Sequence, residues 1–231
     1  MRVWIWGALG LCAGSFTACA ADRYAREESI FKGRSHCAAC GHPLGAGDLV
    51  PVVSYLVLRG RCRYCGAKIP RSFLTSELEL MVLFLCAGAS CARDPEAVSV
   101  SLGFVLMKYM ALCDEYTMTV GAYDWLWAFP LWLITRKISS LAYGLFFAAA
   151  AIVCASLLER VKKESVMGKG DPFLLFSTAL IWGEKTAGVL FLACVWGIAR
   201  LLVSGKKRVP FAAALYYGAA AFFLVETAGI L

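Results

Sequence analysis

The chain has 231 residues, of which 60% are hydrophobic and 17% are charged, and its mean hydropathy is +0.68. A soluble domain is about half apolar and about a quarter charged. The composition therefore excludes an ordinary soluble protein and indicates an integral membrane protein. The net charge of +7 does not indicate nucleic-acid binding, because the basic residues gather in particular loops, as they do where charge orients a membrane protein.

Apolar segments predict eight spans. They cover residues 1–21, 73–90, 97–113, 121–135, 138–158, 172–183, 187–204 and 209–230. The segment 172–183 is the weakest, since a straight span needs about 20 residues, and it is a candidate for a broken or re-entrant element. Residues 1–21 also look like a signal peptide. We interpret them as a retained first span, because so basic a following loop is normally held in the cytoplasm, and cleavage is the alternative.

Eight spans place four loops on one side of the membrane. These loops are 22–72, 114–120, 159–171 and 205–208, and they hold most of the 23 Lys and Arg residues. The asymmetry predicts that this side is cytoplasmic. The fold class is therefore an all-α integral membrane protein with about eight transmembrane helices. Lys108 and Arg200 fall within predicted spans, where we expect their charged ends to extend to the interface.

Four of the eleven cysteines form two Cys-x-x-Cys pairs in the first basic loop: Cys37, Cys40, Cys62 and Cys65. Four thiolates make a closed tetrahedral zinc site, and the spacing predicts a structural Zn²⁺ in a small zinc-ribbon-like cytoplasmic insertion. The alternatives are two redox dithiols or four free thiols. His36 and His42 flank the first pair, but four cysteines already fill the metal shell, so neither histidine is expected to be a ligand.

A second stretch, 167–172, contains Gly168, Gly170 and Asp171 where a loop meets an apolar segment. Glycines permit a tight turn that a ligand can approach closely. We expect Asp171 to be the N-cap of the next helix, with Pro172 in its first position. A plain helix cap is the alternative interpretation. The functional interpretation rests on Asp114, which the topology places at the end of the third span on the same side of the membrane.

Together these stretches resemble the bacterial prepilin peptidase family, the type IV leader peptidases. The resemblance is carried by residues 14–16, 37–42, 51–65, 69–78, 168–171 and 210–211. It implies a membrane aspartyl endopeptidase that cuts the leader of type IV prepilins or pseudopilins at the cytoplasmic face of the bacterial inner membrane. Many members also N-methylate the new terminus with S-adenosylmethionine. The implied partners are a prepilin substrate and the lipid bilayer.

Carried over by position, Asp114 and Asp171 are the catalytic pair, and Gly168 and Gly170 belong to the loop that supports catalysis. The resemblance divides the chain into a first transmembrane helix (1–21), a cytoplasmic four-cysteine domain (22–72) and a transmembrane peptidase core (73–231). Two carboxylates that share one proton can supply both the base and the acid of peptide hydrolysis. Helix polarity suggests that Asp171, at a helix start, carries the charge and Asp114, at a helix end, carries the proton.

The chain departs from the family beside both aspartates. Pro172 and Phe173 replace the usual Val-Lys, and Glu115 and the residues after it lack the usual basic stretch and proline. These departures motivate a non-catalytic alternative, a membrane scaffold of pilus or type II secretion assembly. A second alternative is a transporter that uses Asp114, Asp124 and Asp171 as a proton relay.

Overall fold

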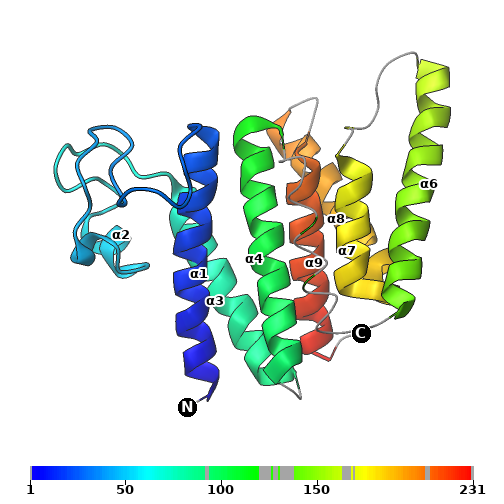
Figure 1. Ribbon diagram of the computed structural model, residues 1–231, viewed down its shortest axis with the longest axis horizontal. Coiled ribbons are helices and arrows are strands. Elements are labelled where there is room, and N and C mark those ends of the chain that lie inside the picture. The colour runs from blue at the N-terminus through cyan, green and yellow to red at the C-terminus, as the bar shows by residue number, and fades with distance from the viewer. Residues whose placement is uncertain are drawn as a thin grey trace. The chain divides into compact units, whose positions relative to one another are not determined.

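The computed structural model describes residues 2–91, 94–119, 138–162, 170–205 and 209–229, together with Leu126, Pro130 and Gly168. These residues form helices and loops, with no sheet in the described part of the chain (Figure 1). The helices are α1 (Arg2–Ala25), α2 (Val53–Val57), α3 (Arg71–Ser90), α4 (Asp94–Thr117), α6 (Ile138–Lys162), α7 (Asp171–Trp182), α8 (Thr186–Ser204) and α9 (Phe211–Thr227). Two short 3₁₀ turns, η1 (Ala46–Asp48) and η3 (Gly183–Lys185), complete the set. The all-α class predicted from the sequence is confirmed.

Seven of the eight predicted apolar segments coincide with these helices. The other, 121–135, lies outside the described residues except for Leu126 and Pro130. Among the described residues, five helical stretches are long and apolar enough to cross a membrane, and α9 is a shorter apolar helix. One of the five, Asp171–Ser204, contains α7, η3 and α8. The weak predicted segment 172–183 is thus the 12-residue helix α7. The residue that follows it, Gly183, is its C-cap and has a positive φ of 57°.

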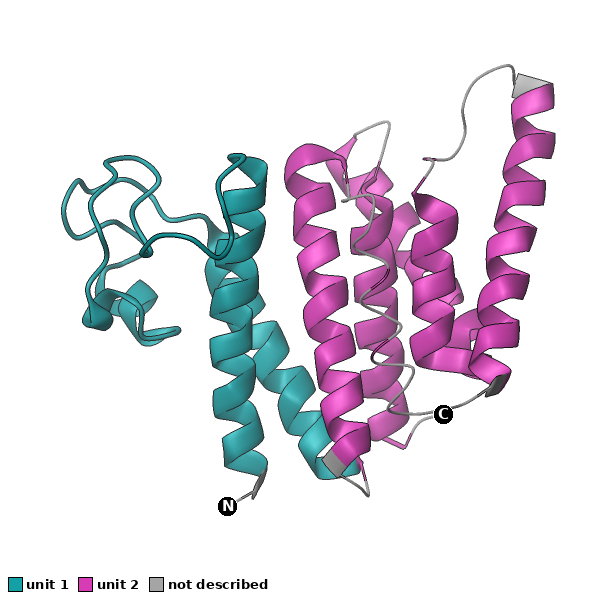
Figure 2. Ribbon diagram, in the orientation of Figure 1, with its two compact units in different colours: residues 1–90 teal, residues 91–231 magenta. Residues whose placement is uncertain are grey.

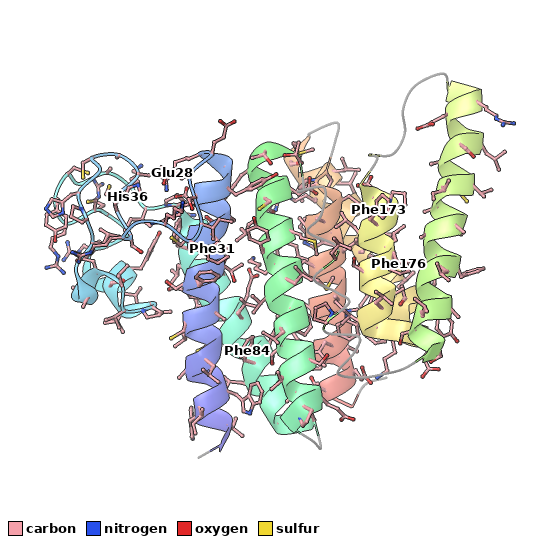
Figure 3. All side chains as sticks on the ribbon, in the orientation of Figure 1. Glu28, Phe31, His36, Phe84, Phe173 and Phe176 are labelled. Atoms are coloured by element: carbon pink, nitrogen blue, oxygen red, sulfur yellow. The ribbon has the colours of Figure 1, made fainter. Side chains whose placement is uncertain are left out.

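The chain divides into two compact units, Met1–Ser90 and Cys91–Leu231 (Figure 2). In the first unit, α1 packs against α3 with almost no space between the two backbones. A Cβ added to Gly14 would lie 2.5 Å from the Cα of Glu77, and Gly10 meets the carbonyl oxygen of Leu80 equally closely. Near the other end of the pair, the rings of Trp6 and Phe84 lie 6.1 Å apart (Figure 3). Small residues bring these helices together, as is common in membranes.

In the second unit, α9 packs against α4 and α8, and α6 packs against α7. Gly218 of α9 lies against the backbone of α8, where an added Cβ would be 2.6 Å from the carbonyl oxygen of Val189. Phe176 of α7 points toward α6 and fills the space over Gly144 (Figure 3). The ends of α4, α6 and α8 and the starts of α7 and α9 all lie at one end of this unit (Figure 1). That arrangement agrees with the predicted common side of the loops 114–120, 159–171 and 205–208.

Candidate functional site: a four-cysteine cluster and two aspartates

The two Cys-x-x-Cys pairs fold into matching knuckles. In the first, Gly41 donates its N–H to the Cys37 carbonyl at 2.8 Å, and Cys37 donates to the carbonyl of His42. The second knuckle repeats both bonds at Cys62, with Gly66 as the donor at 3.0 Å. Gly41 and Gly66 have φ values of 71° and 72°, a backbone conformation that favours glycine. The glycine after each pair is therefore required by the turn.

The knuckles bring the four sulfur atoms together. The Sγ atoms of Cys37, Cys40, Cys62 and Cys65 all lie within 4.8 Å of one another, and those of Cys37 and Cys65 are 3.9 Å apart. Tetrahedral ligands about 2.3 Å from a zinc ion would be about 3.8 Å apart. The backbone N–H of Cys40 is the main cause that lowers the pKa of Cys37 to about 7, whereas burial and the neighbouring thiols raise the pKa of Cys65 to about 11. The donor set therefore fits a metal ion.

Side chains within the Cys62–Cys65 pair fasten the second knuckle to the turn η1 and to His42 beside the first knuckle. Asp48 accepts hydrogen bonds from Arg63 Nε at 2.7 Å and from the Tyr64 hydroxyl at 3.3 Å. The Arg63 bond is the main reason that the pKa of Asp48 is held below its usual range. The ring of Tyr64 also stacks on His42, with centroids 3.6 Å apart. His42 is thus a packing residue outside the sulfur cluster.

Arg23 organises the chain that leads into the first knuckle, a role that sequence reasoning missed. Its guanidinium is buried and donates to four backbone carbonyls, at residues 29, 30, 32 and 34. Nearby, His36 lies 3.4 Å from a carboxylate oxygen of Glu28 (Figure 3). Arg23 was counted only as an orienting charge, because its acceptors are backbone groups that no sequence pattern reveals.

A cavity of about 420 Å³ separates the cysteine knuckles from α1 and α3 within the first unit. Its lining includes Phe16 of α1, Tyr55 of α2, and Phe73 and Glu77 of α3. The carboxylate of Glu77 is buried and accepts the backbone N–H of Val52 at 2.7 Å. Glu77 is therefore a structural anchor between α3 and the start of α2.

Asp114 lies in the last turn of α4 and is buried, with 7% of its surface exposed. Its Oδ2 atom accepts the backbone N–H of Ala212 at 2.8 Å, in the first turn of α9. The residue before this helix, Pro210, makes no side-chain cap, so Asp114 satisfies from outside one of the N–H groups that every helix start leaves free. The aspartate thus joins the end of α4 to the start of α9.

Asp171 is the first residue of α7, so the helix begins one residue earlier than predicted. The N-cap is Gly170, so the predictions of an Asp171 cap and of Pro172 in the first helical position were wrong by one residue. The carboxylate of Asp171 reaches backward and accepts the N–H of Gly168 at 2.9 Å, while the Asp171 N–H donates to the Gly168 carbonyl at 3.1 Å. This reciprocal pair resembles a capping box and fixes the carboxylate beside the glycine loop.

The fold brings these two carboxylates to the same end of the second unit, on α4 and α7 (Figure 1). The helix-polarity argument that gave them different protonation states does not hold. Asp114 also faces a helix start, that of α9, so polarity favours neither as the proton carrier. Asp124 lies outside the described residues.

The two basic residues predicted to reach the interface behave differently. Lys108 is only 1% exposed, and its ammonium lies 4.7 Å from the ring centroid of Tyr216 and 5.3 Å from that of Tyr217. The prediction was wrong for Lys108, because two aromatic faces of α9 hold its charge inside the unit. Arg200 is half-exposed and lies 3.7 Å from Glu115.

These features define a helical membrane protein with a four-thiolate module and two carboxylates at one end of its second unit. Residues 8–91 match the family model described as the Bacterial Peptidase A24 N-terminal domain. A prepilin leader peptidase/N-methyltransferase of Myxococcus xanthus is 30% identical over 215 residues, which is 86% of this chain and 63% of the relative. The Bacillus subtilis protein of the same name is 27% identical over 93% of this chain and 91% of its own length.

A third relative of that name, from Burkholderia pseudomallei, is 30% identical over 90% of this chain and 72% of its own length. The chain therefore belongs to the prepilin leader peptidase/N-methyltransferase family. No solved structure matches it.

Proposed function

We propose that this protein is a membrane-embedded aspartyl endopeptidase that removes the leader of type IV prepilins or pseudopilins, with Asp114 and Asp171 as its catalytic pair. The observation that carries the proposal is the placement of two carboxylates from different helices at one end of the second unit, Asp114 in the last turn of α4 and Asp171 at the start of α7. Family membership supports the reaction class and the substrate class, since the relatives are named prepilin leader peptidase/N-methyltransferase. In this proposal the active site lies at the cytoplasmic face of the inner membrane.

The chemistry needs one carboxylate to activate water and the other to protonate the leaving nitrogen. Two carboxyl groups at close range share a proton because both cannot stay ionised, and the pair titrates as a unit. The backbone N–H groups of Ala212 and Gly168 each bind one oxygen. A Cβ added at Gly170 would meet no described atom within 4 Å, which leaves room there for an extended substrate to approach.

We extend the proposal to N-methylation of the new N-terminus, since the relatives are named for both activities. S-adenosylmethionine, when bound, supplies the methyl group. The four cysteines fit a structural Zn²⁺, which would fix the two knuckles relative to each other. In this proposal residues 1–21 are the first transmembrane helix, 22–72 the cytoplasmic four-cysteine domain, and 73–231 the peptidase core.

The test is conversion of a co-expressed prepilin by Asp114→Asn and Asp171→Asn. An amide oxygen still accepts the N–H of Ala212 or Gly168, so both variants should remain folded in the membrane. Neither amide can act as base or acid, so cleavage should fall at least about a thousandfold in each. The double variant should be hardly worse than either single one, because residues that act as a unit are not additive. Gel mobility and mass spectrometry of the new N-terminus give the readout.

One observation favours the scaffold as a second candidate. The bond from Ala212 to Asp114 gives this aspartate a structural role that needs no catalysis. The asparagine variant separates the two, since it keeps that bond and removes the acid. Full processing by Asp114→Asn or Asp171→Asn would refute the aspartyl mechanism. No processing by the wild-type protein with its own prepilin would support the scaffold.

A further inference from the structure

Residues 49–58 form a stretch of ten residues without a charge, between Asp48 and Arg59. Five of its large apolar side chains are exposed, although one of them, Leu49, also reaches the edge of the cavity in the first unit. They are 44–70% exposed: Leu49, Val50, Val53, Leu56 and Val57. The opposite side of α2 is the one that faces the protein, because Ser54, Tyr55 and Leu58 line the cavity in the first unit. A water-exposed loop would show the reverse arrangement.

The position of this stretch along α1 explains why its apolar side chains are exposed. Val52 is bonded to Glu77, and the backbone of Glu77 touches that of Gly14 in α1. Gly14 lies near the middle of the apolar helix Val3–Ala25. The nearest charged residue toward the knuckles is Asp22, about 12 Å further along at about 1.5 Å per residue. Figure 1 shows α2 at the height of the middle of α1.

Most backbone N–H groups at the start of the stretch are also satisfied within the protein, as a medium without water requires. A hydrocarbon environment leaves no partner for a free N–H group. Pro51 has no N–H, and the Val52 N–H is held by the Glu77 carboxylate. The N–H groups of Leu49, Val53 and Ser54 donate to nearby carbonyl oxygens.

We propose that residues 49–57 are a membrane-embedded element whose apolar side chains insert into the acyl-chain boundary of the leaflet nearest the cysteine knuckles. The occupant of this apolar face is lipid, because the face lies beside a spanning helix and at its apolar depth. Exposed Arg59 and Arg61 follow directly and are placed to meet anionic headgroups. The element would hold the knuckles against the bilayer surface. This inference does not depend on the proposed reaction.

The first experiment compares Val57→Cys with Lys32→Cys in the full-length protein in nanodiscs of phosphatidylethanolamine and phosphatidylglycerol. Both positions are exposed on the protein itself. A charged, membrane-impermeant maleimide should modify position 57 about tenfold or more slowly than position 32, because charge is excluded from the hydrocarbon region. Peptide-level mass spectrometry separates these sites from the native cysteines, and unfolding in SDS should make them equally reactive. Equal rates in nanodiscs would overturn the proposal.

The second experiment identifies what covers the face. Nanodiscs are made with a lipid that carries a photoreactive diazirine on its acyl chain, and the unmodified protein is irradiated. Lipid adducts are expected on residues 49–57. Slow maleimide labelling without these adducts would mean that protein covers the face, either another segment or a second copy, and would equally overturn the assignment to lipid.

Discussion

Two regions of the molecule are held together in different ways. One is the cysteine module, residues 35–69, and the other is the aspartate site, formed by Asp114, Asp171 and their backbone donors. In the module, each knuckle is closed by hydrogen bonds between neighbours in the sequence, such as Gly41 to Cys37. Cys40 and Cys65 are exposed, and a loop this small has little apolar core of its own. We therefore expect its order to depend on a metal ion.

The aspartate site depends on helix packing instead. The bond between Ala212 and Asp114 joins residues 98 positions apart and is buried. It forms only when α4 and α9 are aligned, and α9 is in turn set by its close contact with α8 at Gly218. Because of this difference, we expect each region to lose its ordered structure without disturbing the other. Metal loss should disorder the module and spare the aspartates, whereas a packing defect in α9 should do the opposite.

The largest effect is expected from Cys62→Ser. Removal of one thiolate opens the four-sulfur site, and structural zinc in small domains contributes about 10–16 kcal/mol. The variant should bind no zinc by elemental analysis and should be cut rapidly by protease within the module, while prepilin cleavage continues and methylation is lost. Cys194→Ser, at an exposed cysteine of α8, should behave as wild type. Zinc retained by Cys62→Ser would contradict the four-thiolate site.

Gly218→Ala should break the other side of the comparison. The added methyl group would lie 2.6 Å from backbone atoms of Val189 and Ala193, so α8 and α9 must separate, at a cost of about 1–3 kcal/mol. The unfolding midpoint in detergent should fall, and prepilin cleavage with it, while zinc content stays normal. The control is Gly197→Ala in α8, where no atom lies within 4 Å of the new Cβ. Equal midpoints for the two variants would refute the packing argument.

The comparison also explains what could be predicted from the sequence. The knuckles were predictable because their ligands are three residues apart and the following glycines mark the turn, so the whole signal lies in short stretches. The helices were predictable because apolar length is a local property. The order of the apolar segments predicted that Asp114 and Asp171 share one side of the membrane, and the family resemblance then implied that they are a catalytic pair.

The contacts that fix the exact geometry could not be predicted in this way. The burial of Lys108 depends on two tyrosines of α9, and the capping of α9 by Asp114 depends on the packing of α4. The shift of the α7 start by one residue arises because the carboxylate of Asp171 binds the N–H behind it. Side-chain choices of this kind are decided by tertiary neighbours, and helix ends are the least certain feature of a sequence-based prediction.

A smaller effect on the aspartate site is expected from Gly168→Ala. Its Cβ would lie 3.3 Å from both carboxylate oxygens of Asp171, which is tight enough to turn the carboxylate. Prepilin cleavage should fall about tenfold, because a displaced catalytic group loses its alignment, while the unfolding midpoint hardly changes. In Gly170→Ala the new methyl group meets no atom of the described residues within 4 Å. If that variant is inactive but stable, the glycine serves the approach of the substrate; if Gly168→Ala is fully active, Asp171 is not held as described.

The smallest effect is expected from Tyr64→Phe in the cysteine module. The substitution removes the 3.3 Å bond to Asp48 and keeps the stack on His42. The free energy of unfolding of the zinc-bound module, measured by its resistance to protease, should therefore fall by at most about 1 kcal/mol. Tyr64→Ala removes both contacts and should cost more. Because Arg63 holds the pKa of Asp48 below its usual range, the stabilisation from this carboxylate is present above its unfolded value and is lost only as the pH falls through the lower folded value. Asp48 stays ionised both at about pH 6 and at about pH 8. The difference in the free energy of unfolding between Tyr64→Phe and the wild-type module should therefore be the same at these two pH values. A difference that grows toward the lower pH would show that Asp48 does not fasten the second knuckle as an anion.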